Sequence, residues 1–156
     1  MPRPTRGDHL LGPSAKPKVR GSGSAFQPGT LELNRQQFIV LDTPAWFAWL
    51  EQQLAFRFQQ VYYVAGLSLA DPVYLSYTVR PERRQQGPIY WYAYKKHHNR
   101  RLRGTYLGQT NNVTLAHLDQ LALQFLSQID PVFYQQVCQR GLVRFRKGPP
   151  DLNLKL

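Results

Sequence analysis

The feature of this sequence that most constrains its fold is a strand–turn–strand pattern over residues 89–108. Residues 89–96 alternate: Ile, Trp and Ala take the odd positions as far as residue 93, and Tyr takes the even positions as far as residue 94. A β-strand points successive side chains to opposite faces, so this spacing separates an apolar face from a tyrosine face. The polar residues 97–100 favour a turn, and residues 101–108 return as a second strand. The pattern therefore predicts a β-hairpin.

Other periodic patterns predict the elements around the hairpin. Asp42-Thr43-Pro44 combines capping side chains with a proline at the first helical position, which is typical of a helix start. Similar signals begin helices at Thr114 and at Asp130-Pro131. Apolar spacing then predicts a helix over residues 44–53, strands over residues 54–58 and 73–80, a helix from residue 115 to beyond residue 125, a short helix over residues 131–139 and a last strand near residues 142–146.

These elements predict an α+β fold: a small three-stranded antiparallel sheet backed by a helix, with an N-terminal helix and a short C-terminal helix. One helix covers only one face of a sheet, so the other face must meet solvent or a partner. Residues 1–30 are rich in Pro, Gly, Ser and basic residues, which predicts a disordered basic arm. Residues 31–147 are then a single domain, followed by a loose tail over residues 148–156.

The positive charge of the chain is concentrated at the hairpin. The 156 residues include 20 Lys or Arg and nine Asp or Glu, a formal net charge of +11. Residues 80–103 hold eight of the basic residues and one acidic residue, so this stretch carries +7. Such a concentration is typical of proteins that bind polyanions. Anionic lipid or an acidic protein would also bind such a positively charged surface, so the partner has to be inferred from the chemistry of the surface.

The hairpin carries the side chains that contact with duplex DNA requires. A two-stranded ribbon fits the major groove, which is about 12 Å wide. Arg and Lys neutralise phosphates, Arg also pairs with guanine edges, and Tyr hydroxyls bond to phosphates. Gly104 would let the backbone approach the ligand closely. The predicted nucleic-acid-binding residues are Arg80, Arg83, Arg84, Tyr92, Tyr94, Lys95, Lys96, Arg100, Arg101, Arg103, Gly104 and Tyr106. We therefore expect a non-enzymatic DNA-binding protein.

A series of short motifs also resembles a module of bacterial proteins. In order, these motifs are LDTPAWFAWL at residues 41–50, the Phe-x-Phe strand at residues 56–58, YWYAY at residues 90–94, YLG at residues 106–108 and the leucine-rich helix at residues 115–121. The series is similar to the N-terminal segment of some MalT-like LuxR-family regulators and to small proteins of filamentous bacteria and cyanobacterial mobile elements. This resemblance implies a regulator or an accessory factor of a mobile element.

The hairpin and the following helix also resemble the arm-binding domain of tyrosine recombinases and the APETALA-type DNA-binding domain of plants. Those folds lay a three-stranded sheet in the major groove and back it with a helix. The resemblance implies that Trp91, Ala93 and Leu107 lie beneath the sheet, and that the DNA-facing residues are Tyr92, Tyr94, Lys96, Gly104 and Tyr106. This chain has Tyr where charged base-reading residues often stand in those domains.

Two other functions use the same residues. Aromatic sheet faces stack single-stranded bases in several RNA-binding modules, so Tyr90, Tyr92 and Tyr94 suit single-stranded RNA as well. Alternatively, the basic surface docks an acidic protein, with the tyrosines as the contact patch.

Catalytic, metal and membrane functions find little support in the sequence. His97 and His98 are adjacent in a turn without a nearby carboxylate, which predicts solvated residues rather than metal ligands, and no metal or cofactor is expected. The one cysteine, Cys138, is spaced from Phe133 and Val137 as a buried helix residue would be, and has no neighbouring base. A single cysteine excludes an internal disulfide, and no long apolar run is present. We therefore expect a cytoplasmic protein.

Overall fold

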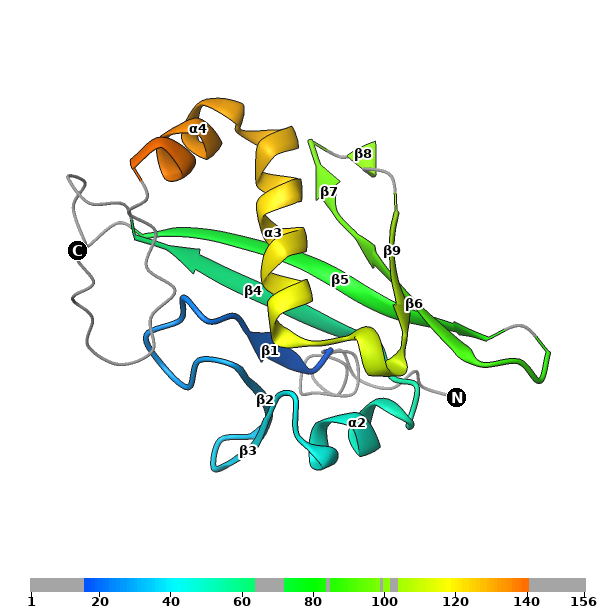
Figure 1. Ribbon diagram of the computed structural model, residues 1–156. Coiled ribbons are helices and arrows are strands. Elements are labelled where there is room, and N and C mark those ends of the chain that lie inside the picture. The colour runs from blue at the N-terminus through cyan, green and yellow to red at the C-terminus, as the bar shows by residue number, and fades with distance from the viewer. Residues whose placement is uncertain (1–15, 64–71, 84, 99, 102–103, 141–156) are drawn as a thin grey trace, which may run out of the picture.

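The computed structural model describes residues 16–63, 72–83, 85–98, 100–101 and 104–140, with the backbone alone at residues 100, 101 and 140. Its elements are β1 Lys18–Arg20, β2 Thr30–Asn34, β3 Gln37–Val40, α2 Pro44–Leu50, β4 Phe56–Tyr62, β5 Val73–Arg83, β6 Ile89–Tyr94, β7 Lys96–His97, β8 Arg100–Arg101, β9 Thr105–Gln109, the short 3₁₀ helix η1 Thr110–Asn112, α3 Leu115–Ile129 and α4 Pro131–Arg140. Figure 1 shows their arrangement.

The described strands form one mixed sheet of seven strands in the order β3-β2-β1-β4-β5-β6-β9, together with a separate β7–β8 pair. β1 runs parallel to β4, and the other neighbours in the large sheet are antiparallel. The expected three-stranded sheet is therefore wrong, although the α+β class is compatible with the structure. The three expected strands do lie side by side as β5, β6 and β9. The sheet then continues through β4 to a sub-structure of β1, β2 and β3 that the sequence patterns missed.

The predicted helix starts are confirmed by their capping bonds. Thr43 Oγ1 accepts a hydrogen bond from Trp46 N at the start of α2, and Pro44 occupies its first position. Thr114 caps α3 in the same way. The carboxylate of Asp130 accepts from a backbone N–H in the first turn of α4. Within each of these segments, the local sequence was sufficient because a cap satisfies backbone N–H groups that the helix itself leaves unpaired.

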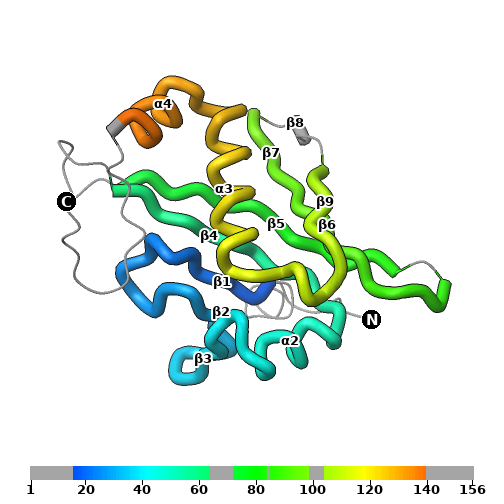
Figure 2. The backbone as a smooth tube through the Cα atoms, viewed as in Figure 1, coloured from blue at the N-terminus to red at the C-terminus, as the bar shows by residue number. Residues whose placement is uncertain are grey.

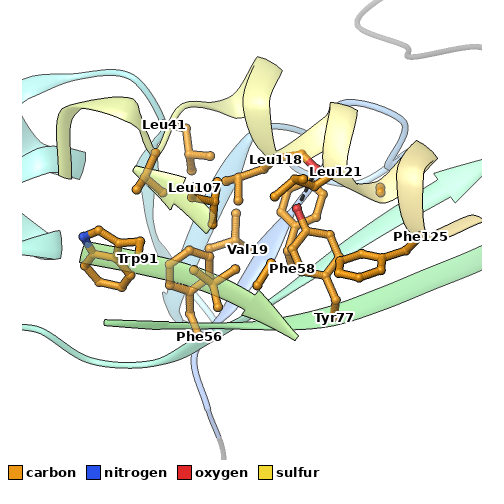
Figure 3. Packing of buried hydrophobic residues seen from close by; sticks show 14 of the residues in the cluster. Val19, Leu41, Phe56, Phe58, Tyr77, Trp91, Leu107, Leu118, Leu121 and Phe125 are labelled. Atoms are coloured by element: carbon orange, nitrogen blue, oxygen red, sulfur yellow. Dashed lines mark hydrogen bonds between the residues drawn. The ribbon is translucent and has the colours of Figure 1, made fainter. Parts of the chain in front are cut away.

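The core lies between one face of the sheet and α3, which crosses the strands in Figure 1. The rings of Phe58 and Tyr77 lie 5.3 Å apart, and the ring of Tyr77 lies 5.1 Å from that of Phe125 on the helix. The buried hydroxyl of Tyr77 donates a 2.6 Å hydrogen bond to the carbonyl of Leu118, drawn dashed in Figure 3. Tilted aromatic contacts of this kind contribute to stability beyond the apolar area that they bury.

The other two helices pack on the same face of the sheet. Trp46 of α2 lies 5.6 Å from the ring of Phe56, and Phe133 of α4 lies 6.3 Å from the ring of Tyr62. Phe56 and Tyr62 point to the same side because they are separated by an even number of positions along β4. In the described part of the chain, all three helices therefore cover one face and leave the other without a helix.

Residues 16–30 belong to the fold, which corrects the expected disordered arm over residues 1–30; residues 1–15 lie outside the described residues. Figure 2 shows β1 between β2 and β4. Gly21 and Gly23 are buried against the sheet, where an added Cβ at Gly23 would stand 2.1 Å from the carbonyl oxygen of Val61. The Gly-Ser composition thus reflects close packing of backbone on backbone rather than a flexible linker.

Three smaller expectations are also corrected. The helix expected over residues 44–53 ends at Leu50, and Leu54, expected in the following strand, is exposed and lies before β4. Cys138 is exposed on α4, so its spacing did not predict burial. The domain begins before residue 31, because β1 lies inside the sheet. The last strand expected near residues 142–146 lies outside the described residues, and among those described no helix is long and apolar enough to cross a membrane.

Candidate nucleic-acid interface

We call the sheet face opposite α3 the open face. Its side chains alternate along each strand with the buried ones, as the burial patterns of β4, β5 and β6 show. The cross-strand registers place Arg57 opposite Thr78, Arg80 opposite Tyr92 and Tyr92 opposite Tyr106. The polar and aromatic residues that the registers place on the open face include Lys18, Arg20, Glu32, Phe38, Arg57, Gln59, Tyr74, Ser76, Thr78, Arg80, Glu82, Tyr90, Tyr92, Tyr94, Tyr106 and Gln109.

Tyr90, Tyr92, Tyr94 and Tyr106 form a tyrosine cluster on β6 and β9. The ring of Tyr92 lies 5.3 Å from that of Tyr106 and 6.5 Å from that of Tyr94, and Tyr90 lies 6.1 Å from Tyr106. Half of the Tyr106 side chain is exposed, while the three tyrosines of β6 are half-buried. The alternation of apolar and tyrosine residues in β6 is therefore confirmed, because Ile89, Trp91 and Ala93 are buried.

Tyr94 joins this cluster to the charged part of the open face. Its hydroxyl donates a hydrogen bond of 3.0 Å to Glu82, and the guanidinium of Arg80 lies 5.9 Å from its ring centre. Cations over a tyrosine ring are attracted by its π-electrons, so this arrangement supports the orientation of both side chains. An added Cβ at Gly104 would stand 2.6 Å from Cε1 of Tyr94. Gly104 therefore gives room to the Tyr94 ring, a role that the sequence reading did not foresee.

A hollow of about 350 Å³ opens beside Tyr94, and we call it the basic hollow. Its lining residues are Lys16, Arg57, Ser76, Tyr77, Thr78, Arg80, Tyr94, Lys95 and Lys96. β6 ends at Tyr94, and the next residue, Lys95, lines the basic hollow. Burial, and then the positive charge of Arg57, lower the pKa of Lys95 from its ordinary value.

The structure brings part of the expected site together. Arg80, Tyr92, Tyr94 and Tyr106 lie on the open face, and Lys95 and Lys96 line the basic hollow beside it. Arg83 is exposed at the end of β5, where its Nε donates to the carbonyl of Gly87. The remaining expected residues cannot be assigned to this face: Arg84 and Arg103 lie outside the described residues, and Arg100 and Arg101 are placed by their backbone in β8 alone.

Four cationic residues of this surface were not predicted from the sequence, and all of them come before β5. Arg57 and Lys16 line the basic hollow, while Lys18 and Arg20 lie on β1. Arg57 had a visible signal, because it stands between the buried Phe56 and Phe58 and must point to the opposite face. Arg20 is already neutralised by a 2.7 Å salt bridge to Glu32. Lys16 and Lys18 reach this surface because β1 pairs in parallel with β4, and no local sequence pattern indicates that pairing.

The described residues contain no group of three or more His, Cys, Asp or Glu side chains that would hold a metal ion. The rings of His97 and His98 lie 3.9 Å apart in the turn after β7. Nδ1 of His117 lies 3.0 Å from the carbonyl oxygen of Asn112, next to the start of α3. These histidines therefore do not gather into one site.

Comparison with known proteins supplies no family for this chain. No protein-family model matches it, no curated protein matches it, and no solved structure matches it. Its function therefore has to be inferred from the open face itself.

Proposed function

We propose that this chain is a non-enzymatic nucleic-acid-binding protein that holds an unpaired strand on the open face of its sheet. The observation that carries the proposal is that the tyrosine cluster and the basic hollow adjoin on the open face, which no described helix covers, and share Tyr94. Aromatic rings on a sheet surface stack unpaired bases, and neighbouring cations hold the phosphates between those bases.

The width of the sheet favours an unpaired strand over a duplex. Seven strands at a spacing of about 4.8 Å span about 29 Å between the outer strand axes, whereas the major groove is about 12 Å wide. Strand β6 is flanked by β5 on one side and β9 on the other, so the hairpin is not an isolated ribbon. Duplex DNA, the ligand expected from the sequence, is therefore compared with unpaired strands in the binding experiment below.

The biological setting is a further part of the proposal. We place the protein in the cytoplasm, in keeping with a single cysteine that cannot form an internal disulfide. A role as a regulator or as an accessory factor of a mobile element rests on the sequence resemblance alone.

Fluorescence anisotropy tests the proposal with unpaired DNA, unpaired RNA and duplex DNA of about 12 nucleotides or base pairs. We expect an unpaired strand to bind more tightly than the duplex, with a logarithmic salt slope of about −0.7 for each phosphate contacted. Stronger duplex binding would restore the groove mechanism. Weak binding of all three ligands at physiological salt would refute the proposal and direct the search to an acidic protein.

Two pairs of variants locate the contact. Tyr106→Ala removes an exposed ring and should cost about 1–3 kcal/mol of binding to the unpaired strand, whereas Tyr106→Phe keeps the stacking surface. Arg57→Gln should weaken binding and flatten the salt slope. Arg35→Gln is its matched control, because Arg35 is exposed in the turn between β2 and β3, at the sheet edge opposite β9. Equal effects of Arg57→Gln and Arg35→Gln would show that only net charge matters.

A further inference from the structure

The basic hollow has walls from four separate parts of the chain. Arg57 and Thr78 face each other across β4 and β5, and Nη1 of Arg57 donates a 3.3 Å hydrogen bond to Oγ1 of Thr78. The backbone N–H of Arg57 donates to the carbonyl of Pro17, which holds neighbouring Lys16 beside the same strand. Lys95 and Lys96 complete the lining where the chain leaves β6.

The charges around this hollow are unbalanced. Among the described residues that line it, five of nine are Lys or Arg and none is Asp or Glu. One described acidic residue, Glu82, is hydrogen-bonded to a residue of the lining: its carboxylate accepts from the Tyr94 hydroxyl. Lys95 is half-buried near Arg57, and both its burial and this like charge disfavour its protonated form. An anion in the hollow would relieve the repulsion among these cations, because each of them would gain an opposite charge.

We infer that the basic hollow binds the terminal phosphate of a nucleic-acid strand, an inference that rests on the proposed function. A terminal phosphate monoester carries a charge of about −1.5 to −2 near neutral pH and has three strong acceptor oxygens. An internal phosphodiester carries a single negative charge. Five cations gathered around one hollow, with the hydroxyls of Ser76 and Thr78 on its wall, suit the more highly charged group better.

The position of the hollow fits the end of a bound strand. Tyr94 lines the hollow and also contacts Tyr92 of the tyrosine cluster. A phosphate held by Arg57 and Lys95 would therefore place the adjoining base next to the first tyrosine ring. The remaining bases would then extend along β6 towards Tyr106.

The experiment compares three unpaired DNA strands of one sequence: 5′-phosphorylated, 3′-phosphorylated and without a terminal phosphate. We expect one phosphorylated strand to bind at least tenfold more tightly than the unphosphorylated strand, and the preferred end to show the direction of the strand. Arg57→Gln and Lys95→Gln should each reduce the preference to about threefold or less, while Arg35→Gln should retain it. Thermal melting of each variant checks that the fold is intact.

The outcomes separate this inference from the proposed function. If wild-type protein binds all three strands equally well, the protein binds nucleic acid but the terminal-phosphate site is refuted. A preference that survives both Arg57→Gln and Lys95→Gln would also refute the site. If no strand binds, the proposed function fails. A calorimetric titration with inorganic phosphate then tests separately whether the basic hollow binds an anion. Saturable phosphate binding that Arg57→Gln removes would support an anion site, and its absence would overturn the inference.

Discussion

The carboxylate of Asp119 on α3 connects the helix to two distant parts of the sheet. One oxygen accepts a 2.6 Å hydrogen bond from the hydroxyl of Ser22, and the other accepts a 2.7 Å bond from Nε2 of Gln60. Oε1 of Gln60 in turn accepts from the backbone N–H of Gly23 at 2.8 Å. This network holds the turn after β1, and therefore β1 itself, beside β4. Asp119→Ala should consequently destabilise the whole open face.

The expected loss follows from the groups that the substitution leaves without an acceptor. A hydrogen bond to a charged group contributes about 1.5–3 kcal/mol, and Asp119→Ala removes two short ones. Because the carboxylate is only partly buried, water replaces part of the lost hydrogen bonding. We therefore expect the free energy of unfolding to fall by about 2–4 kcal/mol. Asp119→Asn keeps one acceptor oxygen and presents an N–H₂ group that can donate to the Ser22 hydroxyl. Its loss should be about 1 kcal/mol or less.

The pH dependence provides a second measure of the same network. Burial raises the pKa of Asp119 from its model-peptide value of 3.8, although the hydrogen bonds from Ser22 and Gln60 oppose the rise. The folded state therefore binds the proton more tightly than the unfolded state. Stability from this group is fully present below pH 3.8 and is lost as the pH rises through the raised pKa. The stability advantage of wild type over Asp119→Asn should shrink across this range.

Urea unfolding followed by the fluorescence of buried Trp46 and Trp91 measures both effects. With a denaturant slope of about 2 kcal/mol/M, a loss of 2–4 kcal/mol lowers the urea midpoint by about 1–2 M. A midpoint for Asp119→Ala within about 0.3 M of wild type would refute the importance of the network. Equal losses in the Ala and Asn variants would refute the hydrogen-bond explanation.

Three further predictions follow from the packing. Gly23→Ala should lower stability by about 3 kcal/mol in urea unfolding, because its Cβ would stand 2.1 Å from the carbonyl oxygen of Val61; a loss below 1 kcal/mol would contradict this. Tyr77→Phe should cost about 1–1.5 kcal/mol at neutral pH. Burial, and then nearby Asp119, raise the pKa of Tyr77 well above 10, so wild type should lose stability as the pH rises past 10 and the variant should lose less. Gly104→Ala should displace the Tyr94 ring and weaken binding of an unpaired strand, with a melting temperature close to wild type.

The sequence by itself determined the features that depend on neighbouring residues. The helix caps and the alternation of β6 were predicted correctly, because a cap acts within one turn and a strand alternates at every residue. The same period placed the tyrosines on one face and the apolar residues on the other before any strand partner was known. By the same rule, the position of Arg57 between the buried Phe56 and Phe58 predicts that its side chain points to the open face.

Only the tertiary structure decided how many strands pair and where the cations gather. The pairing of β1 with β4 depends on contacts such as Ser22 to Asp119, which are 97 residues apart, and on the close approach of Gly21 and Gly23 to the sheet. A Gly-Ser composition is the same in a linker and in a tightly packed turn, so composition could not distinguish them. The basic hollow combines residues near positions 16, 57, 80 and 95. Its charge arises from the folding of these segments against one another, because no single stretch of sequence contains it.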